Sequence, residues 1–213
     1  MRTRIKICGI TREQDLFAAA DAGADALGFV FHTASARSLD VAAATGLMAR
    51  VPAFVTTVAL FVDADPELVE TVIEHTPVDV LQFHGDEPVD YCRNFGRPYI
   101  KAVRMQTQTE LPELANKYQD AQALLVDSYS PAVAGGSGET FDWTRIPPGI
   151  SMPLVLAGGL DPENVSSAIE QVRPYAVDVS SGVEQGKGIK DAAKMAAFIE
   201  AVRVSDESIR TSR

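Results

Sequence analysis

A cysteine, Cys8, follows the first apolar run of the chain, in the stretch KICGIT at residues 6–11. A thiolate can act as a base, whereas a neutral thiol packs as a small buried side chain. Glycine comes next, and Thr11 and Gln14 then have the Thr-x-x-Gln spacing of a helix capping box. The pattern places Cys8 between a strand and a helix, where packing and acid–base chemistry are both open to it.

An aspartate, Asp127, ends a later apolar run at residues 123–126. Apolar surroundings favour a carboxylic acid over a carboxylate, so a group in this place can hold a proton to donate. That is the chemistry of a general acid, the complement of a cysteine base. A solvated aspartate at a strand end, or one that caps a helix, would give the same pattern, and the residue alone leaves both interpretations open.

Small residues follow the last two apolar runs. They are Gly158 and Gly159 after the seventh run, and Ser180, Ser181 and Gly182 after the eighth. Glycine lets backbone N–H groups approach a phosphate closely, and serine hydroxyls add donors. Tight turns also use glycine, but two such ends on neighbouring runs favour a phosphate site.

Arg37 lies on a long stretch after the second apolar run. A guanidinium there can form a two-pronged pair with a carboxylate ligand, although a lone arginine is more often a solvated surface group. The histidines, His32, His75 and His84, lack the short spacing of metal ligands, so no metal site is predicted. We expect His84 to pack against its loop or brace it.

Two lysines lie within expected strands. Lys6 shares side-chain parity with Cys8, and we expect it to form a structural ion pair with Asp178 in the lower core. Lys101 could be a Schiff-base nucleophile if it were desolvated, but a role in balancing interior acids is the favoured interpretation.

Eight β-rich runs alternate with helical segments. The expected strands are residues 5–7, 26–30, 57–61, 80–83, 99–103, 123–126, 154–157 and 176–179, and the expected helices are residues 12–22, 41–50, 66–75, 88–95, 110–118, 162–172 and 189–204, with one weak turn near Trp143. Alternating strands and helices imply parallel pairing with right-handed crossovers. Eight units predict an α/β fold, a single-domain (β/α)8 TIM barrel, with a doubly wound sheet as the alternative.

The predicted barrel domain covers residues 1–204, and the polar residues 205–213 are expected to form a disordered tail. Active sites of such barrels lie where strands end and helix-bound loops begin. Cys8 and Asp127, at the ends of the first and sixth strands, are therefore expected to face each other across the mouth of the barrel.

The length, net charge and cysteine content of the chain exclude some classes of function. The chain has 213 residues and a formal net charge of −10, which argues against binding to nucleic acid or to a membrane surface. An anionic ligand must therefore be held locally. The two cysteines, Cys8 and Cys92, form no disulfide framework, and neither a signal peptide nor a membrane span is expected, so we predict a cytoplasmic protein, monomer or homodimer.

Six segments together resemble the phosphoribosylanthranilate isomerase family of tryptophan biosynthesis, in order and spacing. They are KICGIT, GADALGFVF, LQFHGDE, GGSGETFDW, LAGGLDPENV and VDVSSGVEQGKG, and the match runs from about residue 5 to residue 199. The resemblance implies a (β/α)8 barrel that converts N-(5′-phosphoribosyl)anthranilate to 1-(o-carboxyphenylamino)-1-deoxyribulose 5-phosphate. It implies no metal and no organic cofactor.

The resemblance also assigns roles to residues. It makes Cys8 the general base and Asp127 the general acid, and Arg37 the partner of the anthranilate carboxylate. It gives the phosphate to the loops that contain Gly158, Gly159, Ser180, Ser181 and Gly182.

The chain departs from the family pattern at two positions. Ala36 stands where the family often has proline, which frees the preceding residue and leaves the placement of Arg37 open. Glu139 stands in a glycine-rich loop where relatives often have lysine. The alternatives are the histidine-pathway aminoaldose isomerase, indole-glycerol-phosphate synthase, and a non-catalytic barrel that binds a phosphorylated ligand.

Overall fold

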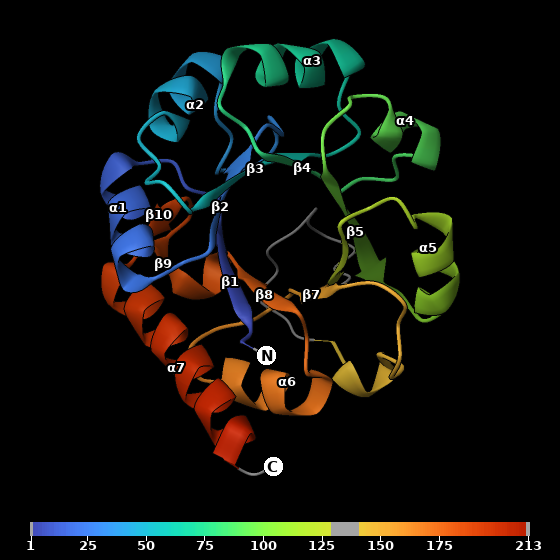
Figure 1. Cartoon of the computed structure of the whole chain (residues 1–213). Helices are drawn as coiled ribbons and strands as arrows, with labels where there is room; N and C mark the ends of the chain where they lie inside the picture. The colour runs from blue at the N-terminus through green and yellow to red at the C-terminus, as the bar shows by residue number, and fades with distance from the viewer. Residues whose placement is uncertain (1, 129–140, 212–213) are drawn as a thin grey trace.

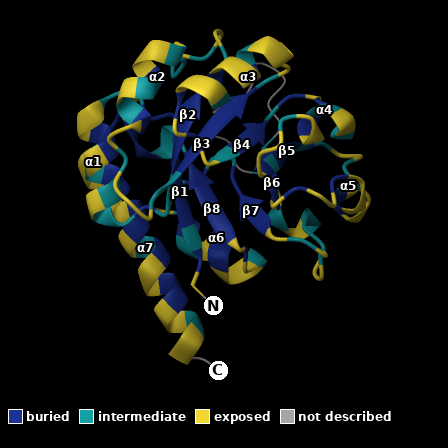
Figure 2. Cartoon of the chain, turned by 45° about the horizontal axis from the view of Figure 1, so that its top comes forward, coloured by how far each residue is buried: buried dark blue, intermediate teal, exposed yellow. Residues whose placement is uncertain are grey.

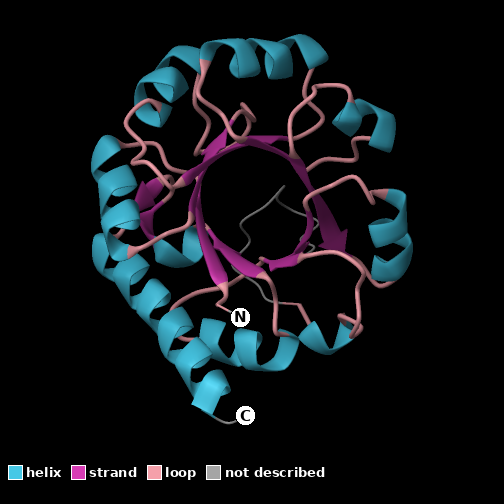
Figure 3. Ribbon diagram, viewed as in Figure 1, coloured by secondary structure: helices cyan, strands magenta, loops and turns pink. Residues whose placement is uncertain are grey.

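The computed structural model describes residues 2–128 and 141–211. Its centre is a closed barrel of eight parallel strands, seen from one end in Figures 1 and 3. The strands are β1 (Arg4–Cys8), β2 (Ala26–Val30), β3 (Thr56–Phe61), β4 (Val80–Phe83), β5 (Tyr99–Met105), β6 (Ala123–Ser128), β7 (Leu154–Leu156) and β8 (Ala176–Val179). Pairing of β1 with β8 closes the barrel, which confirms the predicted fold and excludes an open doubly wound sheet.

Helices form a ring outside the strands (Figure 3). They are α1 (Glu13–Ala22), α2 (Val41–Met48), α3 (Pro66–His75), α4 (Val89–Arg93), α5 (Leu111–Lys117), α6 (Val165–Val172) and α7 (Ala192–Thr211). The weak turn near Trp143 is the short 3-10 helix η1 (Trp143–Arg145). A second 3-10 helix, η2 (Ser181–Val183), follows β8 and leads into an antiparallel hairpin of β9 (Glu184–Gly186) and β10 (Ile189–Lys190).

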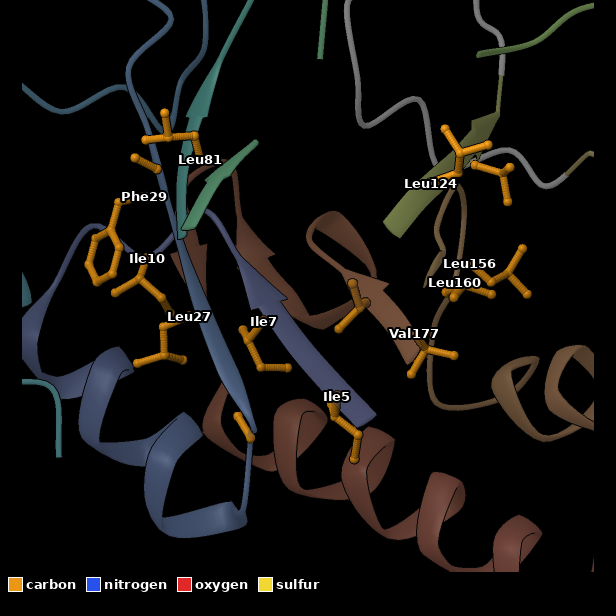
Figure 4. Close-up of a cluster of buried hydrophobic side chains, with 14 of the residues drawn as sticks. Ile5, Ile7, Ile10, Leu27, Phe29, Leu81, Leu124, Leu156, Leu160 and Val177 are labelled. Atoms are coloured by element: carbon orange, nitrogen blue, oxygen red, sulfur yellow. The ribbon is translucent and has the colours of Figure 1, made fainter. Parts of the chain in front are cut away.

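The main hydrophobic core lies between the strands and the helices, and Figure 2 shows the buried strands inside the exposed outer surfaces of the helices. Ile5 and Ile7 of β1 belong to this core together with Phe198 of α7, and Figure 4 shows part of it. Side chains alternate along a strand. Lys6 and Cys8 therefore point into the barrel, as their parity predicted.

The C-terminal boundary of the prediction is wrong. Helix α7 continues to Thr211, so residues 205–211 are helical rather than a disordered tail. Asp206 is buried and accepts hydrogen bonds from the backbone N–H of Thr3 (2.7 Å) and from its hydroxyl (2.8 Å). The polar composition of this segment concealed a packed helix, because the buried carboxylate finds its partners at the other end of the chain.

The start of α1 also differs from the prediction. Arg12 is its N-cap residue, and neither Thr11 nor Gln14 forms the expected capping box. The Thr11 hydroxyl instead donates to the carbonyl oxygen of Gly188 (2.7 Å), in the turn of the β9–β10 hairpin. This contact fixes the hairpin against the loop that follows β1.

The two Asp-Pro pairs behave differently. Asp65 is the N-cap residue of α3, with Pro66 at its first position. Asp161 accepts the backbone N–H of Asn164 (2.9 Å) in a turn before α6, which begins only at Val165. In the part of the chain that the structure describes, no helix has the length and apolar character needed to cross a membrane.

Candidate active site

One pocket opens at the carboxyl ends of the strands. Residues at or just after the carboxyl ends of all eight strands line it, among them Cys8, Arg37, His84, Asp127, Gly158, Gly159, Asp178, Ser180 and Ser181. All predicted site residues except Gly182 are in this lining. A Cβ atom at Gly182 would lie 1.9 Å from the carbonyl oxygen of Leu160, so this glycine allows the loops after β7 and β8 to pack together.

Cys8 is buried against a charged pair. The Nζ atom of Lys6 donates to Oδ1 of Asp178 (2.9 Å), which confirms the predicted ion pair. The pair does not lie apart from the site in the lower core, because Asp178 lines the pocket and Lys6 is beside Cys8. Gly28 of β2 makes the space: a Cβ atom there would be 2.8 Å from the Cys8 sulfur and 3.1 Å from the Lys6 nitrogen.

These surroundings act on the Cys8 thiol in opposite directions. Burial raises the pKa of Cys8, and the positive charge of Lys6 lowers it by less, so the pKa lies above the ordinary thiol value. Burial also disfavours the Lys6 ammonium, but Asp178 and Cys8 together outweigh it and raise the pKa of Lys6. Lys6 therefore remains charged beside the sulfur and partly offsets the cost of forming a buried thiolate.

Replacing Lys6 with methionine should lower the free energy of unfolding by about 3–5 kcal/mol at neutral pH, because it leaves the buried Asp178 carboxylate without its partner. Burial raises the pKa of that carboxyl above its value in the unfolded chain. In acid, Asp178 is therefore protonated in the folded protein and has no charge that needs a partner. The loss should thus be smaller in acid. Urea unfolding at the two pH values measures it, and an unchanged free energy would refute a stabilising pair.

Asp127 is held by hydrogen bonds on both oxygens. Oδ1 accepts the backbone N–H of Ser128 (2.8 Å), and Oδ2 lies 3.0 Å from Nε2 of His84. The Gln82 amide nitrogen is 2.9 Å from Nδ1 of His84, so the two ring nitrogens of His84 link Gln82 to Asp127. His84 does more than brace its loop: it orients the candidate acid.

The loop after β7 passes close to Asp127. Gly158 has φ +84°, and a Cβ atom there would lie 2.9 Å from Oδ1 of Asp127 and 2.3 Å from the backbone nitrogen of Ser128. Gly159 has φ +65°. Only glycine combines this conformation with this approach, so the loop can bring its backbone N–H groups to the pocket.

The loop after β8 leads into η2, the short extra helix that often accompanies a phosphate site in these barrels. The Ser180 hydroxyl donates to the carbonyl oxygen of Cys8 (3.0 Å) and is therefore not free as a ligand donor. Among the described residues, the Ser181 hydroxyl has no hydrogen-bond acceptor. Ser181 and the backbone of this loop are thus the better candidates to hold an anion.

Arg37 lines the pocket from the loop after β2, and its position is well fixed. Its Nε and Nη2 atoms donate to the two carboxylate oxygens of Glu184, at 2.7 and 2.8 Å. Its backbone N–H donates to the Ser35 hydroxyl (3.1 Å). The proline that the family often has in place of Ala36 is therefore not needed to position the Arg37 side chain.

Lys101 is buried and does not line the pocket. Its Nζ atom donates to Oε2 of Glu87 (2.8 Å) and to the carbonyl oxygen of Gly85 (2.6 Å), which confirms that it balances an interior acid. Across residues 2–128 and 141–211, no group of acidic, histidine or cysteine side chains is arranged to hold a metal ion. Glu139 lies outside the described residues.

A family model and two relatives match nearly the whole chain. The family model for N-(5′phosphoribosyl)anthranilate (PRA) isomerase matches residues 5–201. Two relatives named N-(5′-phosphoribosyl)anthranilate isomerase are each 54% identical to the chain. The one from Pseudomonas fluorescens aligns over 95% of this chain and 96% of its own length, and the one from Thiobacillus denitrificans over 96% and 100%.

Solved structures give the same result. Phosphoribosyl anthranilate isomerase from Thermotoga maritima is 39% identical, covers 95% of this chain and 99% of its own, and superposes with a TM-score of 0.87. A phosphoribosyl anthranilate isomerase in complex with reduced 1-(o-carboxyphenylamino)-1-deoxyribulose 5-phosphate is 36% identical, with the same coverage and a TM-score of 0.81. The chain therefore belongs to the N-(5′-phosphoribosyl)anthranilate isomerase family.

Proposed function

We propose that this protein converts N-(5′-phosphoribosyl)anthranilate to 1-(o-carboxyphenylamino)-1-deoxyribulose 5-phosphate, the Amadori rearrangement of tryptophan biosynthesis. The observation that carries the proposal is the meeting of Cys8, Asp127 and Arg37 with the loops after β7 and β8 in one pocket. A related enzyme has been solved with the reduced product of this reaction, which supports the same ligand here.

Asp127 is the general acid of the first step. It donates its proton to the ring oxygen of the ribose, the bond from that oxygen to C1′ breaks, and the lone pair of the amine nitrogen forms an iminium. The hydrogen bond between His84 and Asp127 and the one donated by the backbone N–H of Ser128 hold the carboxyl group in one orientation. General acid catalysis of this kind supplies about 10²–10⁴-fold.

Cys8 is the base of the second step. Its thiolate takes the proton from C2′, the electron pair of that bond forms the enolamine, and the iminium nitrogen becomes neutral. The enolamine then tautomerises to the ketone of the product. Lys6 lies next to the sulfur, outside the pocket lining, and its positive charge stabilises the thiolate.

The two ends of the substrate fix the reacting carbons between the acid and the base. The loops at Gly158–Gly159 and at Ser180–Gly182 hold the phosphate, and Arg37 holds the anthranilate carboxylate. Anchors at both ends turn two bimolecular proton transfers into reactions within one bound complex. No metal or organic cofactor takes part in this scheme.

Partner and location follow from the proposed reaction. The partner is the phosphorylated small molecule, and the protein acts as a monomer or a homodimer; the Thermotoga maritima relative is described as dimeric. The free cysteines Cys8 and Cys92 fit a cytoplasmic location.

A turnover assay tests the reaction directly. Freshly made phosphoribosylanthranilate is fluorescent, and the purified protein should remove its fluorescence with saturation kinetics. The substrates of the histidine-pathway isomerase and of indole-glycerol-phosphate synthase serve as comparison substrates. The second alternative relies on a catalytic lysine, whereas the interior Lys101 is bonded to Glu87 outside the pocket. Binding of phosphoribosylanthranilate without turnover would favour the non-catalytic barrel and reject the proposal.

Arg37→Ala should lower kcat/KM for phosphoribosylanthranilate by at least about tenfold, because a hydrogen bond to a charged group is worth roughly 1.5–3 kcal/mol. Affinity for inorganic phosphate should hardly change, since the phosphate loops are built from other strands. Steady-state kinetics and phosphate inhibition measure the two effects. Unchanged kinetics would place the carboxylate anchor elsewhere on the pocket wall.

A further inference from the structure

The β9–β10 hairpin carries two charged side chains in the protein interior. Glu184 is 9% exposed and Lys190 is 2% exposed. Neither takes part in the acid–base steps described above, and neither lines the pocket. Charged groups are rarely buried unless they are paired, so their partners indicate what they do.

Glu184 pairs with Arg37 from behind the pocket wall. Its carboxylate accepts from Nε (2.7 Å) and Nη2 (2.8 Å), which occupies one whole edge of the guanidinium. Among the described residues, Nη1 has no hydrogen-bond acceptor. The edge formed by Nη1 and the second hydrogen of Nη2 is therefore free to bind another carboxylate in the same two-pronged way.

Lys190 connects this pair to the phosphate side of the pocket. Its Nζ atom donates to Oε1 of Glu184 (2.9 Å) and to the carbonyl oxygen of Ser180 (3.1 Å). The Ser180 hydroxyl in turn donates to the carbonyl oxygen of Cys8 (3.0 Å). A continuous set of polar contacts thus runs from Arg37 to the loop after β8 and to the end of β1.

Backbone packing holds Arg37 against the same hairpin. A Cβ atom at Gly188, whose φ is +76°, would lie 2.7 Å from the carbonyl oxygen of Ala36. A Cβ atom at Gly9, whose φ is +81°, would lie 2.4 Å from Cδ of Arg37. The loop before Arg37 and the stem of its side chain are therefore enclosed by two glycines, which leaves the guanidinium little freedom to turn.

We propose that Glu184 is a positioning residue for substrate specificity: it turns the free edge of Arg37 to the pocket and, through Lys190, fixes that edge at a set distance from the phosphate loop. The site would then select sugar phosphates whose aromatic amine bears an ortho carboxylate. This inference rests on the proposed function, in which Arg37 binds the anthranilate carboxylate.

The charge of Glu184 alone would have the opposite effect. A carboxylate behind Arg37 reduces the positive potential that an anionic substrate meets, so its removal would strengthen binding if only charge mattered. If orientation matters more, its removal weakens binding of the carboxylate end. The two explanations predict opposite signs for the same variant.

Two ligands and two variants test the proposal. The ligands are reduced 1-(o-carboxyphenylamino)-1-deoxyribulose 5-phosphate and the same compound without its carboxyl group, and titration calorimetry gives their dissociation constants. Glu184→Gln keeps the shape of the side chain. Its uncharged amide, however, offers only one acceptor oxygen to Arg37 and Lys190. Glu170→Gln, at an exposed position on α6, is the matched control.

Glu184→Gln should weaken binding of the carboxylate-bearing ligand about tenfold or more and leave the carboxylate-free ligand within about twofold. Glu170→Gln should change neither. An equal loss for both ligands would mean a merely structural role, and tighter or unchanged binding of the first ligand would also overturn the proposal.

A second variant tests the proposal independently if Glu184→Gln folds poorly. Glu184→Asp keeps the charge for Lys190 but is too short to keep both contacts with Arg37, so the same selective loss is expected. The wild-type protein separates the two claims. If it binds neither ligand and does not turn over phosphoribosylanthranilate, the proposed function fails; if it binds both and the variants lose no selectivity, only the role of Glu184 fails.

Discussion

Cys8→Ser is expected to lower kcat for phosphoribosylanthranilate by at least about 10²-fold, the lower bound for the loss of a general base. Serine fits the space that Gly28 leaves for the sulfur, but its hydroxyl is hardly ionised at neutral pH. KM should change little, because the anchors at the two ends of the substrate remain. Stopped-flow or steady-state fluorescence assays of the purified variant measure the effect.

The pH profile of the wild-type enzyme should support the same assignment. Burial raises the pKa of Cys8, so activity of the free enzyme should still rise with pH above the ordinary thiol range. In Lys6→Met, which removes the opposing positive charge, this rising limb should move to still higher pH. Iodoacetamide alkylation rates against pH give an independent titration of the thiol.

Cys92→Ser is the matched control for Cys8→Ser. Cys92 is buried in α4, outside the pocket, so this variant should keep the wild-type kcat. A Cys8→Ser enzyme with near-normal kcat would mean that the thiol only packs, and the base would have to be sought elsewhere on the pocket wall.

Asp127→Asn is expected to stop ring opening almost completely, with a loss in kcat of at least about 10²-fold. The amide has the shape of the carboxyl group but no proton to transfer to the ribose oxygen. Reduced 1-(o-carboxyphenylamino)-1-deoxyribulose 5-phosphate should still bind, because that ligand needs no proton transfer. Asp21→Asn, on the exposed side of α1, is the control and should be fully active.

A covalent mechanism, in which Lys101 attacks the substrate, predicts a different result from the acid–base mechanism. If that lysine attacked the substrate, borohydride added during turnover would trap an adduct on it, which peptide mass mapping would locate. We expect no adduct, since Lys101 is held by Glu87 and by the carbonyl oxygen of Gly85. An adduct together with an active Asp127→Asn enzyme would overturn the acid–base mechanism.

The barrel could be predicted because the alternation of strands and helices can be recognised in short stretches of the sequence. Strand parity placed Lys6 and Cys8 inside the barrel, and the order of the strands placed their carboxyl ends around one mouth. The main error of fold, the tail after residue 204, arose because Asp206 is satisfied by Thr3, which is 203 positions away in the sequence.

The contacts around the candidate residues could not be predicted in the same way. His84 meets Asp127 across 43 positions, and Arg37 meets Glu184 across 147. A single sequence gives no register between such distant side chains, and each residue alone has an ordinary interpretation as a loop or surface group. Glu184 had one available signal, its place in the VDVSSGVEQGKG segment, but nothing there indicated its partner.

The pairing of β1 with β8 has a consequence for the order in which the site is assembled. Lys6 lies opposite Asp178 in that pairing, so the ammonium beside Cys8 gains its carboxylate only when nearly the whole chain has been synthesised. Contacts of this sequence separation form slowly, because a large loop must close first. During translation, the ion pair beside the Cys8 thiol can therefore form only after β8 has been synthesised.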